Sequence, residues 1–245
     1  MSVIPLKLSG LTSFADFADG FPYAGDGLYS TVHQRHPGIV KIKKERVAVR
    51  HLQKVFEATF SISSHIGFYE MSVRDLCQET GISMGSMYSC INKKEDIAVM
   101  VMDMVELISK QVIDVGQQQA NDWQRLSVTI QQHLYSSHLL QSWFFFLYFE
   151  TRCLPLEKQK QSKAIELQAI DNYALIIQQG IKAGLFKVDG KRNNIDFVAN
   201  TVLVMLQDSY LKPWKSKQYH VDIEQYFQNL IAMIAKLVNY DGETL

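Results

Sequence analysis

The chain has few cysteines and no long hydrophobic run, and both absences narrow what it can be. Its 245 residues include three cysteines, Cys77, Cys90 and Cys153, with neither metal-site spacing nor an even number for disulfides. This usage indicates a protein of the reducing cytoplasm. The apolar run Trp143 to Phe149 is far too short to cross a bilayer, and the start MSVIPLKLSG does not resemble a signal peptide. We therefore expect a cytoplasmic protein with no membrane partner.

Enzymatic motifs are also missing. The sequence contains no glycine-rich phosphate loop, no G-x-S-x-G and no H-E-x-x-H. Its seven histidines are scattered, and His133 and His138 are five residues apart, which puts them on different faces of a helix. We expect no enzyme, and hence no catalytic residue, no metal site and no cofactor.

The chain has no net charge, yet its charge is unevenly distributed. Residues 33–94 hold ten lysines and arginines against five aspartates and glutamates, a surplus of five positive charges. Residues 95–245 hold fourteen against seventeen, a surplus of three negative charges. A positive surplus confined to one segment is typical of a nucleic-acid-binding surface within an otherwise neutral protein.

That basic segment contains two short predicted helices joined by a tight turn. Ser72 can cap the first helix, and Asp75 can return a hydrogen bond to the backbone of Ser72, which is a capping box. Gly81 can end this helix, and Ser83 can cap the second. Such a pair is either an ordinary helical hairpin or a helix-turn-helix, whose second helix enters the major groove of DNA.

A third helix follows at once. Asn92 and Glu95 form another expected cap and capping-box pair, so the helix is predicted to begin near Lys93 and to continue to Val112. Lys93 and Lys94 then lie at a helix N-terminus, where free N–H groups already favour an anion. Together with Tyr88 they would form a phosphate clamp.

These residues carry a resemblance to a known family. Gly67-Phe68, Ser72 to Leu76, Gly81-Ile82-Ser83, Gly85-x-Met87-Tyr88 and Lys94-Glu95-x-Ile97 together resemble the DNA-binding domain of TetR/AcrR-family repressors, over about residues 46–101. Relatives usually have an aromatic residue or histidine near positions 89 and 90 and phenylalanine at 91, where this chain has Ser89, Cys90 and Ile91. Its base preference therefore cannot be copied from a relative.

The resemblance implies which residues meet DNA. The expected set is Arg46, Ser72, Arg74, Ser83, Met84, Gly85, Ser86, Tyr88, Ser89, Lys93 and Lys94. Within it, Ser72, Tyr88 and the two lysines are expected on phosphates, whereas Arg74, Met84, Ser86 and Ser89 are expected at base edges. Gly85 would allow the backbone to approach DNA closely. Cys90 is read as a small passive side chain rather than a redox switch.

Residues 1–42 form an extension that the resemblance does not cover. Glycines and prolines interrupt regular helix there, but five aromatic residues are too many for an ordinary solvated tail. We expect a partly ordered segment. It either packs on its own dimer or, helped by Arg35, Lys41, Lys43 and Lys44, contacts DNA or a partner.

The remaining sequence predicts helices, with no convincing strand alternation, and the fold class is therefore all-α. The expected helices are 46–66, 123–137, 142–154, 156–183, 194–211 and 221–240. The predicted domains are the extension (1–42), a helix-turn-helix DNA-binding domain (43–95) and a helical regulatory domain for ligand binding and dimerisation (96–245).

The regulatory domain is expected to bind a hydrophobic effector. Its aromatic run is either core or the wall of a pocket, because small-molecule sites are concave and aromatic-lined. The candidate pocket residues are Trp123, Trp143, Phe146, Phe149, Glu150, Arg152, Tyr173, Ile177, Leu206 and Tyr210. Segments 149–155, 180–186 and 210–214 weakly resemble the family branch that senses fatty acyl-CoA, so acyl-CoA is one candidate and another hydrophobic effector is the other.

The last two long helices carry apolar stripes that, as in the family, predict a dimer interface. The candidate interface residues are Val198, Val202, Ile223, Phe227, Leu230, Ile231 and Ile234, and packing within one chain is the alternative. The sequence thus predicts a homodimeric, ligand-responsive regulator, most simply a repressor, that binds a palindromic DNA operator. The alternative is a ligand-independent regulator controlled by a partner protein or through its extension.

Overall fold

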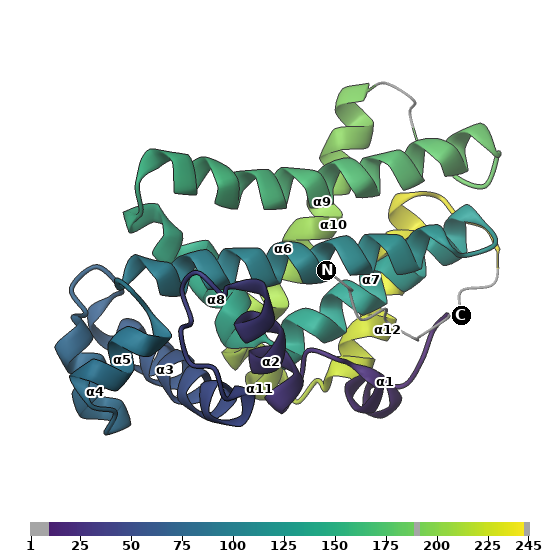
Figure 1. The fold of residues 1–245 in the computed structure, drawn as a ribbon. Coiled ribbons are helices and arrows are strands. Elements are labelled where there is room, and N and C mark those ends of the chain that lie inside the picture. Colours follow the sequence, from purple (N-terminus) through teal and green to yellow (C-terminus); the bar gives the residue numbers. More distant parts are fainter. Residues whose placement is uncertain (1–9, 189–191, 243–245) are drawn as a thin grey trace. The chain divides into compact units, whose positions relative to one another are not determined.

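The computed structural model describes residues 10–188 and 192–242, and within them it consists of helices and connecting loops only (Figure 1). This confirms the predicted all-α fold. The helices in chain order are α1 Phe14–Gly20, α2 Gly25–Arg35, α3 Glu45–Ile66, α4 Val73–Thr80, α5 Met84–Cys90, α6 Glu95–Gln117, α7 Asp122–Leu139, α8 Gln141–Glu150, the 3₁₀ helix η1 Thr151–Cys153, α9 Leu156–Lys182, α10 Arg192–Leu211, α11 Trp214–Tyr219 and α12 Ile223–Leu237. Among the described residues, no helix has the length and apolar character needed to cross a membrane.

The chain forms two compact units. One, the helix-turn-helix unit, contains Pro22–Leu107 and Ser142–Lys163. The other, the C-terminal unit, contains the described residues of Met1–Phe21, Ile108–Gln141 and Ala164–Leu245. Helices α6 and α9 each contribute residues to both units. The grouping therefore follows contacts rather than sequence order, and the predicted domain boundaries at 42 and 95 are not the limits of these units.

The helix-turn-helix unit is built around α3. This helix buries one face, with Leu52, Val55 and Phe56 fully inaccessible to solvent, as the spacing of its apolar residues predicts. Helix α2 packs along α3, and α4 and α5 pack against it as well. Aromatic side chains of α8 complete the core: the ring of Trp143 stacks on that of Phe56, with centroids 4.4 Å apart.

An ion pair fastens α2 to α6. Two guanidinium nitrogens of Arg35 each donate to one carboxylate oxygen of Asp103, both at 2.6 Å, and His36 lies 3.0 Å from the same carboxylate. Burial alone would raise the pKa of Asp103, but the hydrogen bonds from Arg35 and His36 outweigh it and hold this pKa well below its usual range. Residues 22–35 are therefore an integral part of the unit.

The C-terminal unit is organised around α7, against which α1, α10 and α12 pack. Helix α7 is buried along nearly its whole length. The extension reaches it through Thr12, which exchanges two hydrogen bonds of 3.0 Å with the Gln131 side chain, and through Phe14, whose ring meets that of Tyr135 edge to face.

Apart from shifts of a few residues at helix ends, the observed helices differ from the predicted ones in three places. Residues 14–20 and 25–35 are helical although glycines and prolines surround them; Gly27 is needed because a Cβ there would collide with the carbonyl oxygen of Pro22. The helix predicted over 142–154 ends at Glu150 and continues as a 3₁₀ turn. Helix α11, one residue after the expected break at Pro213, was not predicted.

The Arg35–Asp103 pair predicts a pH-dependent contribution to stability. Arg35→Ala should lower the free energy of unfolding by about 2 kcal/mol at neutral pH, because charged hydrogen bonds to a half-buried carboxylate are lost. The pKa of Asp103 is depressed in the folded state, so the contribution is present above the unfolded pKa of about 4 and is lost as the pH falls below it.

Urea unfolding of the wild type and the variant between about pH 3 and pH 8 measures this difference. Arg50→Ala is the matched control, because Arg50 is an exposed arginine of α3. A difference between wild type and Arg35→Ala that stayed constant through acidification would show that the Asp103 carboxylate does not carry the effect.

Candidate DNA-binding surface and regulatory site

The first helix of the motif, α4, begins with the predicted capping box. The Asp75 N–H donates to Ser72 Oγ at 3.2 Å, and the Ser72 N–H donates to Asp75 Oδ2 at 2.8 Å. The Ser72 N–H and the Ser72 hydroxyl, which donates to Asp75 Oδ2 at 2.7 Å, both lower the pKa of Asp75. The helix ends at Gly81, whose φ of 67° is left-handed and favours glycine. Local sequence thus fixes both ends of α4 and the angle at which α5 begins.

Helix α5 divides its side chains between the core and the surface. Ser83 caps it, with the Ser86 N–H donating to Ser83 Oγ at 3.3 Å. Met87 and Cys90 point into the core and are fully buried. The exposed members of the predicted DNA-contact set are Arg46, Ser72, Arg74, Ser83, Met84, Gly85, Tyr88 and Lys93, and Ser86, Ser89 and Lys94 are half-buried. All eleven belong to the helix-turn-helix unit.

Gly85 lies in the first turn of α5, on its solvent-exposed side. A Cβ added at this position would meet no atom of the described residues within 4 Å. Glycine inside a helix costs roughly 0.5–1 kcal/mol relative to alanine, so packing within the protein does not explain its presence. An open glycine is instead what close approach of another molecule requires.

The cations at the start of α6 are not equivalent. Lys94 Nζ donates to the carbonyl oxygens of Tyr69, at 2.6 Å, and Met71, at 2.8 Å, so that two of its three N–H bonds hold the loop before α4. Lys93 is exposed. The helix itself begins two residues later than predicted, and Asp96 rather than Glu95 accepts from the backbone N–H of Asn92, at 2.8 Å.

Cys90 is unsuited to redox sensing. It is fully buried in α5, and burial raises the pKa of its thiol to about 11. The thiolate, which is the reactive form, is therefore scarce at neutral pH. This agrees with its interpretation as a small packing residue.

Half of the predicted pocket residues lie in the helix-turn-helix unit. Trp143 packs on Phe56, and Phe146 meets the ring of Phe68 edge to face at 5.0 Å. Glu150 Oε2 accepts the backbone N–H of Phe68 at 2.8 Å. Phe149 is half-buried, and its ring contacts those of Phe145 and Tyr148. Arg152 is exposed. In this unit Trp143 and Phe146 of the aromatic run form core around α3.

The other half lie in the C-terminal unit and are all buried: Trp123, Tyr173, Ile177, Leu206 and Tyr210. The ring of Trp123 stacks on that of Tyr240 at 4.2 Å. The Tyr173 hydroxyl lies 3.0 Å from Nδ1 of His133, and desolvation by burial lowers the pKa of this histidine to about 4. The ten candidate pocket residues are thus divided between the two units, and their assignment to one effector site stays a prediction.

Sequence reasoning missed a buried polar residue in α7. The Gln132 side chain is fully buried, and neither its amide oxygen nor its amide nitrogen has a hydrogen-bond partner among the described residues. An unsatisfied buried amide costs free energy and is explained by an internal water or a bound molecule. No local pattern reveals it, because a glutamine in a polar stretch of helix normally faces solvent.

The predicted interface residues are mostly buried within the single chain. Val198, Val202, Phe227, Leu230, Ile231 and Ile234 are each less than a tenth exposed, and Ile223 is half-buried. Their helices, α10 and α12, pack on α7. The apolar side chains that these helices leave exposed are others: Phe197 at 72%, Val204 at 52% and Met233 at 57%.

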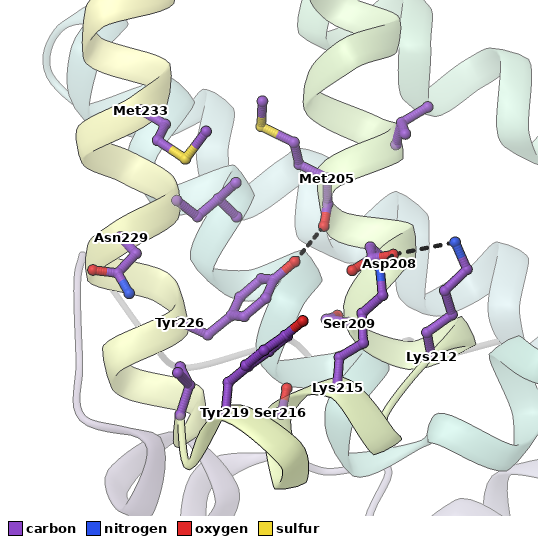
Figure 2. A pocket seen from close by; sticks show the side chains of 13 residues that line it. Met205, Asp208, Ser209, Lys212, Lys215, Ser216, Tyr219, Tyr226, Asn229 and Met233 are labelled. Carbon is purple, nitrogen blue, oxygen red and sulfur yellow. Dashed lines mark hydrogen bonds and ion pairs between the residues drawn. The ribbon is translucent and has the colours of Figure 1, made fainter.

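A groove of about 530 Å³ lies between α10, α11 and α12, on the side that carries Val204 and Met233 (Figure 2). Tyr226 lines it, and the hydroxyl of this residue donates to the carbonyl oxygen of Met205 at 2.7 Å. At one end Asp208 holds the ammonium groups of Lys215, at 2.7 Å, and Lys212, at 3.4 Å. The rest of the lining is largely apolar, so the groove exposes hydrophobic surface to solvent.

Comparison with known proteins identifies the architecture. Neither a protein-family model nor a curated protein matches the chain. A regulatory protein of the tetR family from Rhodococcus RHA1, in contrast, aligns with a TM-score of 0.67 and 15% identity, over 78% of this chain and 98% of that one. This chain has the TetR-family fold. The fold implied by the resemblance of the helix-turn-helix residues is thereby confirmed.

Two further structures with the TetR-family fold were solved with ligands. FadR from Bacillus subtilis, in complex with stearoyl-CoA, aligns with a TM-score of 0.56 and 16% identity, over 74% of this chain and 96% of its own. AibR, in complex with isovaleryl coenzyme A and operator DNA, aligns with a TM-score of 0.63 and 17% identity, over 78% and 99%. Identities this low establish the fold, and ligands must be argued from the residues of this chain.

Gly85 yields a prediction in which stability and DNA binding change in opposite directions. Gly85→Ala should raise the free energy of unfolding by roughly 0.5–1 kcal/mol, because alanine favours the helix and its methyl meets no protein atom. Binding to DNA should weaken by roughly tenfold, or about 1.4 kcal/mol, because the methyl keeps the backbone away from the duplex.

Urea unfolding and fluorescence-anisotropy titration of a labelled duplex measure the two effects. Ser61→Ala on α3 is the control, since it replaces another exposed helical residue by alanine away from α4 and α5. Stabilisation without any loss of DNA affinity in Gly85→Ala would exclude close approach of DNA at this glycine.

Proposed function

We propose that this protein is a ligand-responsive transcription regulator of the cytoplasm, which represses by binding a palindromic DNA operator as a homodimer. The observation that carries this proposal is the exposed face of α4 and α5. It presents Arg74, Met84 and Tyr88 around a helical glycine that has no packing role. The TetR-family fold, found also in AibR, which was solved with operator DNA, supports it.

The exposed residues divide by chemistry into two roles. Arg74 carries a planar guanidinium that can donate two hydrogen bonds to guanine, and Met84 offers an apolar contact to a thymine methyl group. Tyr88, Lys93 and the one remaining N–H of Lys94 suit phosphate oxygens, which fix the register of the protein without reading sequence. Ser89 is a weaker candidate for base contact because its hydroxyl already donates to the carbonyl oxygen of Gly85, at 3.2 Å.

Dimerisation follows from what one such helix can read. Helix α5 has seven residues, so a single copy contacts few bases, and a twofold dimer reads two half-sites about 34–36 Å apart. Helices α10 and α12 remain the proposed interface. Because their predicted stripes face α7, we assign the contact to the exposed residues Phe197, Val204 and Met233. Val204 and Met233 line the groove of Figure 2.

The proposed effector binds in the C-terminal unit and is hydrophobic with a polar amide or carbonyl group. The unpartnered amide of Gln132 supports this class, since it offers one acceptor and two donors inside an apolar interior. Acyl-CoA remains a candidate, because its pantetheine arm carries amides and because two proteins of the same fold were solved with acyl-CoA ligands.

Helix α6 is the proposed transmitter, because it supplies Glu95–Leu107 to the helix-turn-helix unit and the residues from Ile108 onward to the C-terminal unit. An effector shifts the equilibrium between two arrangements of a dimer only by its difference in affinity for them. The operator-bound arrangement would therefore have to bind the effector more weakly than the released one.

Selection of the wild-type protein against random duplexes tests DNA recognition directly. A palindromic consensus with half-sites one helical turn apart is the expected result. Arg74→Ala should then lose about 1–3 kcal/mol per half-site on the consensus and much less on random DNA, because it removes a base contact rather than a phosphate contact. Arg50→Ala serves as an exposed-arginine control. Failure to enrich any sequence would overturn the proposal.

Native mass spectrometry of the purified protein tests the dimer and the effector together. We expect a dimer that carries a small molecule, which denaturing extraction then identifies by class. Met233→Glu should give monomers that remain folded, because Met233 is exposed, whereas Ile231→Glu should unfold the chain, because Ile231 is buried. A dimer that survives Met233→Glu, Val204→Glu and Phe197→Glu together would place the interface elsewhere.

A further inference from the structure

The segment between α2 and α3 lies against the recognition helix α5. The backbone N–H of Lys41 donates to the carbonyl oxygen of Ser89, at 2.8 Å, in the last turn of α5. That carbonyl has no partner within its own helix, because the last four carbonyls of any helix lack one. The extension therefore completes the C-terminal end of the helix that is proposed to read DNA.

Two more contacts fix this segment. His33 Nε2, from α2, donates to the carbonyl oxygen of Ile42 at 2.8 Å, and Asn92 Nδ2 donates to the carbonyl oxygen of Gly38 at 3.4 Å. Between them the Val40 side chain is buried, only 3% exposed. The backbone of residues 38–42 is thus held on both sides, and little of its conformational entropy remains to be lost on binding a partner.

Three lysines project from this held segment or from its continuation into α3. Lys41, Lys43 and Lys44 are exposed, and within residues 10–188 and 192–242 their ammonium groups form no ion pair or hydrogen bond. The acidic neighbour Glu45 does not neutralise them, because its carboxylate accepts from Ser30 and Gln34 of α2. Residues 36–56 contain six lysines and arginines, and Glu45 is the one acidic residue among them.

Other cations of the unit are engaged in the fold. Arg35 is committed to Asp103, and Lys94 holds two loop carbonyls. A helix start that only faces solvent needs no backbone hydrogen bond to α5. Without an anion, this hydrogen bond holds three unpaired ammonium groups in one short segment, at a repulsive cost. Both features make sense if the lysines meet an anion next to α5.

We infer that Lys41, Lys43 and Lys44 form an additional DNA-contact site, in which the extension presents them to the phosphates flanking the groove that α5 enters. This inference rests on the proposed function. It adds to the predicted contact set a strip of lysines from outside the helix-turn-helix motif. The strip carries no base-reading geometry, since ammonium groups are point charges on flexible stems, so it contributes affinity and not sequence preference.

The salt dependence of DNA binding tests the strip with the full-length protein and a random-sequence duplex of about 30 base pairs. Each lysine–phosphate contact contributes about 0.9 to the slope of log K against log salt concentration. Lys41→Gln, Lys43→Gln and Lys44→Gln combined should therefore reduce the slope by about 2.7 per protomer between about 50 and about 200 mM salt.

Two matched variants make the result specific. Lys110→Gln, Lys182→Gln and Lys236→Gln combined remove the same charge from exposed positions of the C-terminal unit and should leave the slope unchanged. The triple Lys→Arg variant of the strip keeps the positive charge and should show the wild-type slope. The reduced slope of the Lys→Gln variant would then be due to the loss of charge.

A wild-type slope in the strip variant, or an equal reduction in the control triple, would overturn the inference while the proposed function stood. Absence of salt-dependent DNA binding by the wild type itself would instead overturn the proposed function. Selection of sequences by the strip variant should return the same consensus as the wild type at lower affinity.

Discussion

The stacking of Trp143 on Phe56 is the contact on which the helix-turn-helix unit depends. A three-helix motif of about fifty residues buries too little apolar surface to be more than marginally stable. Here α3 is covered by α2 on one side and by the aromatic residues of α8, more than eighty positions along the chain, on another. The unit that holds the recognition helix is therefore larger than the motif, and Glu150 extends the same contact to the turn before α4 by accepting the Phe68 N–H.

This packing changes how the regulatory chemistry should be sought. Trp143, Phe146 and Glu150 resemble a pocket wall with a polar end, but their partners are the rings and the backbone of the helix-turn-helix unit. A pocket wall leaves rings facing a cavity, whereas these rings face other rings. A better physical sign of a ligand site is a polar group that is buried without a hydrogen-bond partner. The side-chain amide of Gln132 in the C-terminal unit is such a group among the described residues.

The sequence predicted what is decided locally and missed what is decided at long range. The capping box of α4, the left-handed Gly81 and the cap at Ser83 depend on residues within four positions, and all three are present. The pairs Arg35–Asp103 and Phe68–Glu150 span 68 and 82 residues, and no local pattern contains them. The stripes of α10 and α12 were visible, but periodicity cannot say whether an apolar face meets α7 or a second chain.

The cations of the helix-turn-helix unit are divided between those that the fold uses and those that it leaves unpaired. Arg35 is hydrogen-bonded to Asp103, and Lys94 donates two of its three N–H groups to the loop before α4. The lysines whose ammonium groups have no partner among the described residues, Lys41, Lys43 and Lys44, lie just before α3, in a segment that contacts α5. Self-repulsion of such a cluster destabilises the folded chain, and its segment contacts α5, the helix that also carries the open glycine. One ligand at α5 would account for both features. On the proposed function a phosphate backbone would satisfy both at once: it would neutralise the lysines, and it would lie at the rim of the groove that α5 enters at the glycine.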